Sequence, residues 1–170
     1  YFLNPVHSNL KPSISFCGYI HSYSKRLQWC EYLKQSSLID CHFIYREQFM
    51  HSNYKEYIQN MNQCEFCFCP RGTGNFSIRF YECLYFGRIP VLIDTDILLP
   101  YEDEIDWSNH IVFSKNIEEV QDDIVSFWNS KNIKEIQDNN KKLYENYFNE
   151  KNIIKYFIKS IENYFKFLDK

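Results

Sequence analysis

The chain has 170 residues, the size of one domain, and 45% of them are apolar, which is enough for a hydrophobic core. Its net charge of −3 argues against nucleic-acid binding, which requires a basic patch. No apolar run approaches the roughly 18 residues of a membrane-spanning helix, and no basic-then-apolar leader follows Tyr1. We therefore expect a soluble segment, without a membrane span, that is cut from a longer protein.

Strand and helix patterns alternate along the first two thirds of the chain. Strands are predicted at Ser13–Tyr19, Ile39–Tyr45, Glu65–Cys69, Ile89–Ile93 and Ile111–Phe113. Helices are predicted between them at Ser24–Gln35, Asn53–Asn62 and Phe76–Phe86, and Gly87 stands at the C-terminal cap position of the last. This alternation indicates an α/β fold, a Rossmann-like, mostly parallel sheet flanked by helices.

Three further helices are predicted to close the chain, at Ile117–Asn129, Ile133–Asn149 and Asn152–Leu168. The last carries an apolar stripe that begins at Ile153 and Tyr156, typical of a helix packed on a sheet. We expect residues 1–170 to form a single lobe, with the sheet and a ligand site in 1–115 and the helices in 116–170.

The most informative segment is Cys69–Glu82, in which a predicted strand runs into Pro70-Arg71-Gly72-Thr73-Gly74 and then into a helix. A strand, a glycine loop and a helix N-terminus together bind phosphate, because backbone N–H groups and the helix dipole converge on the anion. Asn75 is expected to cap the helix, and Ser77 in its first turn adds a hydroxyl donor. Gly72 and Gly74 let the backbone approach the anion closely.

Arginine is scarce in this chain, with five residues against 14 lysines. Arg26, Arg46 and Arg71 follow the first, second and third predicted strands, and Arg79 lies in the first turns of the next helix. Ligands of open parallel sheets bind outside the carboxyl ends of the strands. We therefore expect these four arginines to share one anionic ligand, because arginine is a planar, bidentate donor.

Arg79 and Glu82 are three residues apart on one helical face, and two interpretations are open. The pair could be a surface ion pair, contributing roughly 0.2–0.5 kcal/mol. Alternatively, Arg79 contacts phosphate while Glu82 accepts hydrogen bonds from two ribose hydroxyls, for which a carboxylate offers two oxygens.

Seven cysteines, an odd number, lie mostly in apolar runs. Cys64, Cys67 and Cys69 suggest a zinc site, but Cys67 and Cys69 lie on one strand face and no second cysteine or histidine pair completes the ligand set. We interpret the cysteines as small buried hydrophobes. Free thiols favour a reducing compartment, so the expected localisation is cytoplasmic.

The sequence resembles the exostosin family of glycosyltransferases, family 47. The resemblance rests on Pro70-Arg71-Gly72, on Ser77-x-Arg79-Phe80-x-Glu82-x-Leu84, and on Ile89-Pro90-Val91, Leu99-Pro100 and Ile105-Asp106-Trp107. Phe16-Cys17-Gly18, Arg26 and Arg46 extend it, so that it runs from about Ile14 to Phe113. The central block is the specific part.

The resemblance implies the C-terminal, donor-binding lobe of a GT-B enzyme. Such an enzyme uses a nucleotide-sugar donor, usually a UDP-sugar, and transfers the sugar with inversion to a glycan acceptor, without a cofactor or catalytic metal. Carried onto this chain, Arg71, Ser77 and Arg79 hold the diphosphate, with Arg26 reaching it from the first loop. Glu82 holds the ribose, and residues near Arg46 flank the base. A eukaryotic exostosin would place the lobe in the Golgi lumen.

The resemblance also implies what this lobe lacks, since the acceptor and the catalytic base of GT-B enzymes belong to an N-terminal lobe. That lobe is expected to lie outside these 170 residues, so no catalytic base is assigned. The base would deprotonate the acceptor hydroxyl.

Two acidic segments resemble functional sites but are given a different interpretation. Asp94-Thr95-Asp96 matches the Asp-x-Asp metal motif of another glycosyltransferase fold, but we expect no metal there, and Asp94 is expected to touch the donor sugar. Glu102–Trp107 is interpreted as a solvated loop anchored by its tryptophan.

Three alternative functions stay open: a fucosyltransferase-type lobe that uses GDP-fucose, a non-catalytic nucleotide-sugar-binding module, and a receiver-like regulatory domain. The receiver is disfavoured because no acidic pair follows the first strand.

Overall fold

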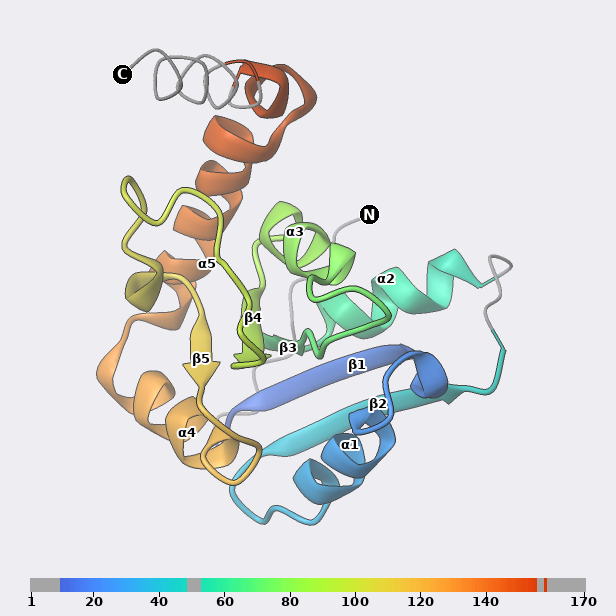
Figure 1. Ribbon diagram of the computed structural model, residues 1–170. Helices are drawn as coiled ribbons and strands as arrows, with labels where there is room; N and C mark the ends of the chain where they lie inside the picture. The colour runs from blue at the N-terminus through green and yellow to red at the C-terminus, as the bar shows by residue number, and fades with distance from the viewer. Residues whose placement is uncertain (1–9, 49–52, 156–157, 159–170) are drawn as a thin grey trace.

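A computed structural model of the chain describes residues 10–48, 53–155 and 158. They form a five-stranded parallel sheet with helices on both faces, in the order β2-β1-β3-β4-β5 (Figure 1). The strands are β1 (Ser13–Tyr19), β2 (Asp40–Arg46), β3 (Phe66–Phe68), β4 (Ile89–Ile93) and β5 (Val112–Ser114). The predicted α/β, Rossmann-like arrangement is confirmed, and it is consistent with a lobe of a GT-B enzyme.

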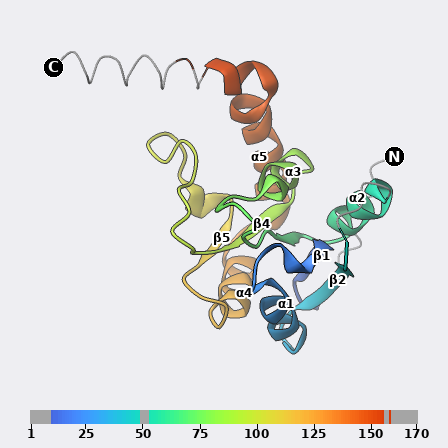
Figure 2. The same cartoon turned by 45° about the vertical axis from the view of Figure 1, so that its right-hand side comes forward.

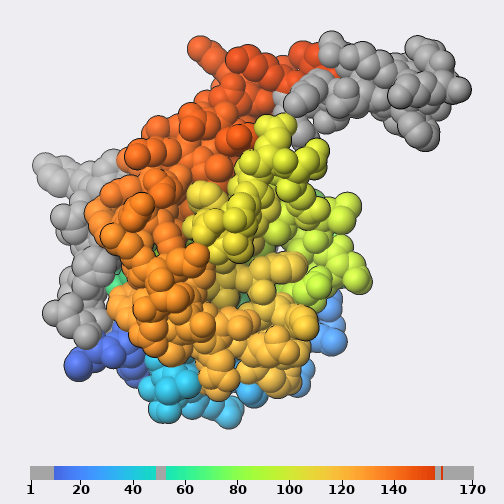
Figure 3. Space-filling model, turned by 90° about the vertical axis from the view of Figure 1, so that its left-hand side faces the viewer, coloured from blue at the N-terminus to red at the C-terminus, as the bar shows by residue number. Residues whose placement is uncertain are grey.

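Four helices cover the two faces of the sheet. Helices α1 (Arg26–Lys34) and α4 (Val120–Ser130) lie on one face, and α2 (Tyr54–Asn62) and α3 (Ile78–Tyr85) lie on the other (Figures 1 and 2). Short 3-10 turns, η1 (Ile20–Ser22) and η2 (Trp107–Asn109), follow β1 and precede β5. Helix α5 (Ile133–Leu143) continues into a π-helical turn, η3 (Tyr144–Phe148). Figure 3 shows α4 and α5 (orange) packed beside the segment that precedes β5 (yellow).

The alternation of side chains along β3 divides the hydrophobic core into two parts. Phe66 and Phe68 pack on the face covered by α1 and α4, whereas Cys67 and Cys69 pack on the face covered by α2 and α3. All four side chains are buried. Burial on both faces is what a parallel sheet requires, and it explains why this strand is a continuous apolar run.

The strand order places a binding crevice at one particular point. The chain runs outward from β1 to β2 and then returns across β1 to β3, so the connections leave in opposite directions on either side of β1 and β3. At such a switch point the loops after two neighbouring strands separate and leave a crevice at their carboxyl ends. The first of these loops begins after Tyr19, and the second is the glycine loop that starts at Pro70.

The observed boundaries agree with the sequence patterns to within three residues, with one exception. β1 and β4 have the predicted limits, while α4 begins at Val120 instead of Ile117. The exception is the helix expected over Ile133–Asn149, which leaves α-helical geometry at Tyr144. The predicted apolar stripe of Asn152–Leu168 lies mainly outside the described residues. Within the described part, no helix has the length and apolar character that a membrane crossing needs.

Gly87 ends α3 as expected, and the structure shows why it must be glycine. Its φ of +64° is a left-handed conformation, and a Cβ at this position would lie 2.8 Å from the backbone oxygen of Gln137. The turn therefore lets α3 and α5 approach closely.

We predict that Gly87→Ala lowers the free energy of unfolding by about 1–3 kcal/mol, because it adds both backbone strain and a clash with backbone atoms. Chemical denaturation measures the change. Gly74→Ala is the control, since the neighbour of its Cβ is the exposed ring of Phe76. Equal losses in the two variants would contradict this account.

Candidate functional site

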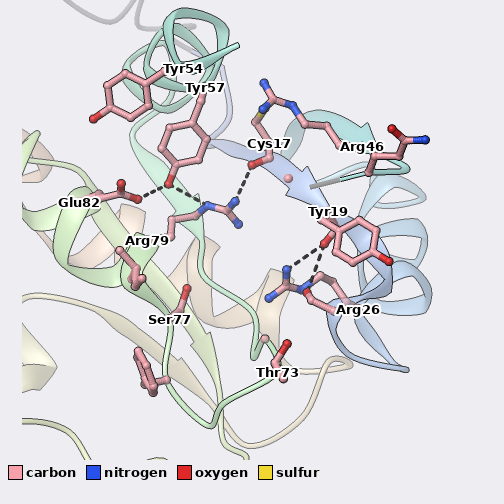
Figure 4. Close-up of a pocket in the computed structure, with 16 residues that line it drawn as sticks. Cys17, Tyr19, Arg26, Arg46, Tyr54, Tyr57, Thr73, Ser77, Arg79 and Glu82 are labelled. Carbon is pink, nitrogen blue, oxygen red and sulfur yellow. Dashed lines mark hydrogen bonds between the residues drawn. The ribbon is translucent and has the colours of Figure 1, made fainter. Parts of the chain in front are cut away.

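A cavity of about 610 Å³ opens at the carboxyl ends of β1, β2 and β3, at the switch point of the sheet (Figure 4). Its volume lies within the usual range of small-ligand sites. Six of the predicted site residues line it: Arg26, Arg46, Gly72, Ser77, Arg79 and Glu82. Aromatic and polar side chains that the sequence analysis did not select complete the wall, among them Tyr19, Gln48, Tyr54, Tyr57, Thr73 and Phe76.

The Arg26 guanidinium joins the end of β1 to the glycine loop. It donates to the backbone oxygen of Tyr19 at 3.0 Å, to that of Pro70 at 2.9 Å, and to that of Arg71 at 2.6 and 3.1 Å. Arg26 is only 8% exposed. Burial lowers the pKa of Arg26 to about 10, and it remains charged at neutral pH. Its hydrogen bonds are committed to the backbone, so Arg26 fixes the shape of the cavity and contributes positive charge to its wall.

Arg79 crosses from α3 toward the end of β1. Its guanidinium carbon lies 4.5 Å from the ring centroid of Phe16 and 5.4 Å from that of Tyr57, within cation–π range of both. Nη2 donates to the backbone oxygen of Cys17. A Cβ on Gly18 would lie 2.6 Å from Nη2, so glycine at this position makes room for the guanidinium.

Tyr57 lies between the two residues that were considered as an ion pair. Its hydroxyl donates to Oε2 of Glu82 and accepts from Nε of Arg79 at 3.4 Å (Figure 4). Burial, together with the negative charge of Glu82, raises the pKa of Tyr57, so its hydroxyl stays protonated and able to donate. The simple surface ion pair is therefore not what forms; Glu82 is held at the cavity wall through a tyrosine of α2.

The glycine loop has backbone donors without partners beside the cavity. Within the described part of the chain, the amides of Gly72, Thr73 and Gly74 donate to no backbone or side-chain acceptor. The first amides of α3 follow in sequence, and the first turn of any helix leaves its N–H groups without intrahelical partners. Unpaired amides beside two arginines are suited to bind an anion.

The expected helix cap at Asn75 is wrong. Ser77 occupies the N-cap position of α3, and its side chain makes no cap hydrogen bond. Asn75 instead exchanges two hydrogen bonds with Thr95, from Nδ2 to the backbone oxygen and from the Thr95 hydroxyl to Oδ1, both at 2.6 Å. Because Asn75 lies two residues before the N-cap, its side chain reaches the loop after β4 and joins it to the glycine loop.

Three other predicted site residues also lie outside the cavity lining: Arg71, Gly74 and Asp94. The guanidinium of Arg71 stacks 5.2 Å from the ring centroid of Tyr23, so only its backbone carbonyl takes part, as an acceptor for Arg26. Asp94 is exposed and accepts from the backbone N–H of Asp96 at 2.9 Å. The four arginines expected at one ligand thus reduce to three at the cavity.

Arg46 reaches the cavity from the end of β2, but its charge is shared. It pairs with Glu56 at 3.0 Å and donates to the backbone oxygen of Asn53.

The acidic loop near Trp107 is, as predicted, a solvent-exposed loop anchored by its tryptophan. The indole is buried and donates to the backbone oxygen of Pro100 at 2.9 Å, while Glu102 is exposed.

Tyr57 is the principal residue that the sequence analysis missed. In the helix predicted at Asn53–Asn62, Tyr57 lies on the same face as Tyr54 and Met61. This spacing predicts only that the face packs on the sheet. The helix does pack on the sheet, but Tyr57 lies near its start, where the phenol reaches beyond the strand ends. The phenolic oxygens of Tyr54 and Tyr57, on a helical face that packs on the sheet, are the sequence signal for such a role.

The switch-point crevice, the unpaired amides of the glycine loop and the carboxylate at the wall define a Rossmann-like lobe with a candidate ligand site. Residues 18–126 match the family described as the Exostosin GT47 domain. This match covers more than half of the chain, and the chain therefore belongs to the exostosin GT47 family.

Individual relatives align over shorter segments. A probable glucuronosyltransferase, GUT1, of Oryza sativa subsp. japonica is 44% identical over 57 residues, covering 34% of this chain and 14% of the relative. A probable beta-1,4-xylosyltransferase, IRX10, of Arabidopsis thaliana is 41% identical over 66 residues, covering 38% of this chain and 16% of the relative. The matched segment thus spans about a seventh of the length of these relatives.

We predict that Arg26→Lys loosens the glycine loop, because one ammonium cannot reach the three carbonyls that the guanidinium bridges. Loss of charge-assisted hydrogen bonds should lower the unfolding free energy by about 2–3 kcal/mol. Hydrogen exchange of the Cys69 amide, which donates to the backbone oxygen of Val91 directly before the loop, should also become faster. Arg46→Lys is the control, because Arg46 bonds Glu56 and Asn53 and not the glycine loop. Unchanged exchange in Arg26→Lys would show that the Arg26 hydrogen bonds are not needed to hold the glycine loop in place.

Proposed function

We propose that this chain is the donor-binding lobe of a glycosyltransferase and that it binds a nucleotide diphosphate sugar, with UDP as the nucleotide. The observation that carries the proposal is the combination, in one cavity, of unpaired loop amides beside Arg79 with the Glu82 carboxylate one turn further along α3. The amides suit a diphosphate, and the carboxylate suits a vicinal diol. The relatives are named as glucuronosyl- and xylosyltransferases, which supports a sugar nucleotide as the ligand.

The diphosphate is placed at the glycine loop. Its oxygens would accept from the amides of Gly72 and Thr73 and from the hydroxyl of Ser77, while Arg79 and Arg26 supply positive charge. Such an array binds anions through geometry as well as charge.

The ribose is placed at Glu82. Among the described residues, Tyr57 is its hydrogen-bond partner and uses Oε2 alone. An ionised carboxylate has about four lone-pair sites, so both ribose hydroxyls can be accepted while the tyrosine stays bound. The base then extends toward Tyr54 and the end of β2, where Arg46 and Gln48 line the cavity.

In the proposed reaction, an acceptor hydroxyl attacks the anomeric carbon while the bond to the diphosphate oxygen breaks, and the configuration inverts. The lobe acts on the leaving group: the loop amides, Ser77 and the two guanidiniums stabilise the negative charge that develops on the diphosphate. We propose that these groups replace a catalytic metal. The base that takes the hydroxyl proton is assigned to an acceptor lobe facing this cavity.

Calorimetry with UDP and GDP, with and without EDTA, tests the ligand class. UDP should bind more tightly than GDP, and its affinity should be unchanged by the chelator. Tighter GDP binding would support the GDP-fucose alternative. Loss of UDP binding in EDTA would show that a divalent metal is part of the site.

Glu82→Gln should weaken uridine and UDP by the same factor, about 10-fold or more, because it replaces charge-assisted hydrogen bonds to the ribose. Calorimetry with both ligands gives the comparison. Glu135→Gln, an exposed change on α5, should leave both affinities unchanged. If Glu82→Gln binds both ligands as the unaltered chain does, Glu82 does not contact the ribose.

A further inference from the structure

Three cysteine thiols converge beneath α3, outside the lining of the cavity. Cys67 lies in β3 and Cys69 directly follows it, with both side chains on the same face of the sheet, and Cys83 comes from the inner face of α3. Their sulfur atoms all lie within 4.8 Å of one another, and all three residues are at most 1% exposed. All seven cysteines of the chain are free thiols. Cys67 and Cys69 are close together in the sequence, and the packing of α3 on β3 brings Cys83 next to them.

The composition of the group selects the kind of ion that it can hold. Among the described residues, the potential ligands brought together here are these three sulfurs, with no histidine or carboxylate in the set. Met61, Phe80 and Leu84 belong to the same apolar cluster. Structural zinc takes four ligands in tetrahedral geometry. An all-sulfur set of three in a dry environment favours Cu(I), a soft ion for which thiolates are selective ligands.

The burial of the group favours a monovalent ion. All three cysteines are buried, and each negative charge placed in a buried site is costly unless it is paired. A monovalent ion needs fewer ionised thiols than a divalent ion does. Arg79 lies near the strand that carries Cys67, since its Nη1 donates to the backbone oxygen of Phe68 at 3.5 Å, and its positive charge offsets a negative site.

We propose that Cys67, Cys69 and Cys83 form a binding site for one Cu(I) ion. Two thiols lose their protons to solvent on binding, and the third remains a neutral donor. The site then carries a net charge of −1 beside the positive charge of Arg79. No electron transfer is involved.

Such a site would tie α3 to β3. Cys83 directly follows Glu82, so an ion held by Cys83 would hold the helix that carries the cavity's carboxylate. The proposal rests on the packing of these two elements and not on the nature of the donor, so UDP calorimetry and the copper measurement can fail independently.

Anaerobic titration of the reduced chain with Cu(I), in competition with the chelator bathocuproine disulfonate, tests the site. One ion per chain should bind, and X-ray absorption should show sulfur ligation alone. Cys83→Ala should weaken binding by about 100-fold or more, since loss of a direct ligand exceeds the effect of changing a residue that only orients a ligand. Cys30→Ala is the matched control, because Cys30 is equally buried but lies in the core on the opposite face of the sheet.

Several outcomes would overturn the proposal: no Cu(I) bound to the folded chain or to a chain refolded with the ion, equal losses in Cys83→Ala and Cys30→Ala, or tighter binding of Zn(II) than of Cu(I). Refolding with the ion covers slow entry into a closed core, because metal sites also load during folding. Circular dichroism checks each variant. If Cys83→Ala does not fold, Cys69→Ala removes a ligand from the strand and decides the question by the same titration.

Discussion

The structure depends first on the buried guanidinium of Arg26. A buried charge is costly unless its hydrogen-bonding groups are paired, and here the acceptors are backbone carbonyls from two separate strand ends. The hydrogen bonds bring the loop after β3 against the end of β1. A Cβ on Gly72 would lie 3.2 Å from Nη2 of Arg26, so the loop passes close to the guanidinium. The carbonyls of the loop turn inward to Arg26, and its amides remain available to a ligand.

Helix α3 connects the glycine loop, which Arg26 holds, to the rest of the site. It can do so because its two faces have different neighbours. Arg79 and Glu82, three residues apart, face the cavity, whereas Phe80, Cys83 and Leu84 are buried. Spacings of three and four residues place side chains on one helical face. One short helix thus carries the proposed ligand contacts on one side and the thiol cluster on the other.

A second constraint is the precise fit of Arg79 beside Gly18 and between two aromatic rings. The guanidinium keeps its charge at the cavity while its hydrogen bond to Cys17 holds α3 to the end of β1. Tyr57 then links Arg79 to Glu82, so the cation and the carboxylate are held in one hydrogen-bonded series without pairing directly. This separation leaves the charge of each available to a different part of a ligand.

The sequence by itself determined the alternation of strands and helices, the glycine loop, the cap at Gly87 and the placement of Arg26, Arg46 and Arg79 near one edge, because periodicity and turn chemistry are local properties. Packing decided the rest. Asn75 binds the loop after β4 instead of capping α3, Arg71 stacks on Tyr23, and Tyr57 enters the site from a helix predicted for packing. Cys83 joins Cys67 and Cys69 only because α3 lies over β3. Residue spacing gives the face of an element on which a side chain lies, but the partner of that face is set by contacts between segments far apart in the chain.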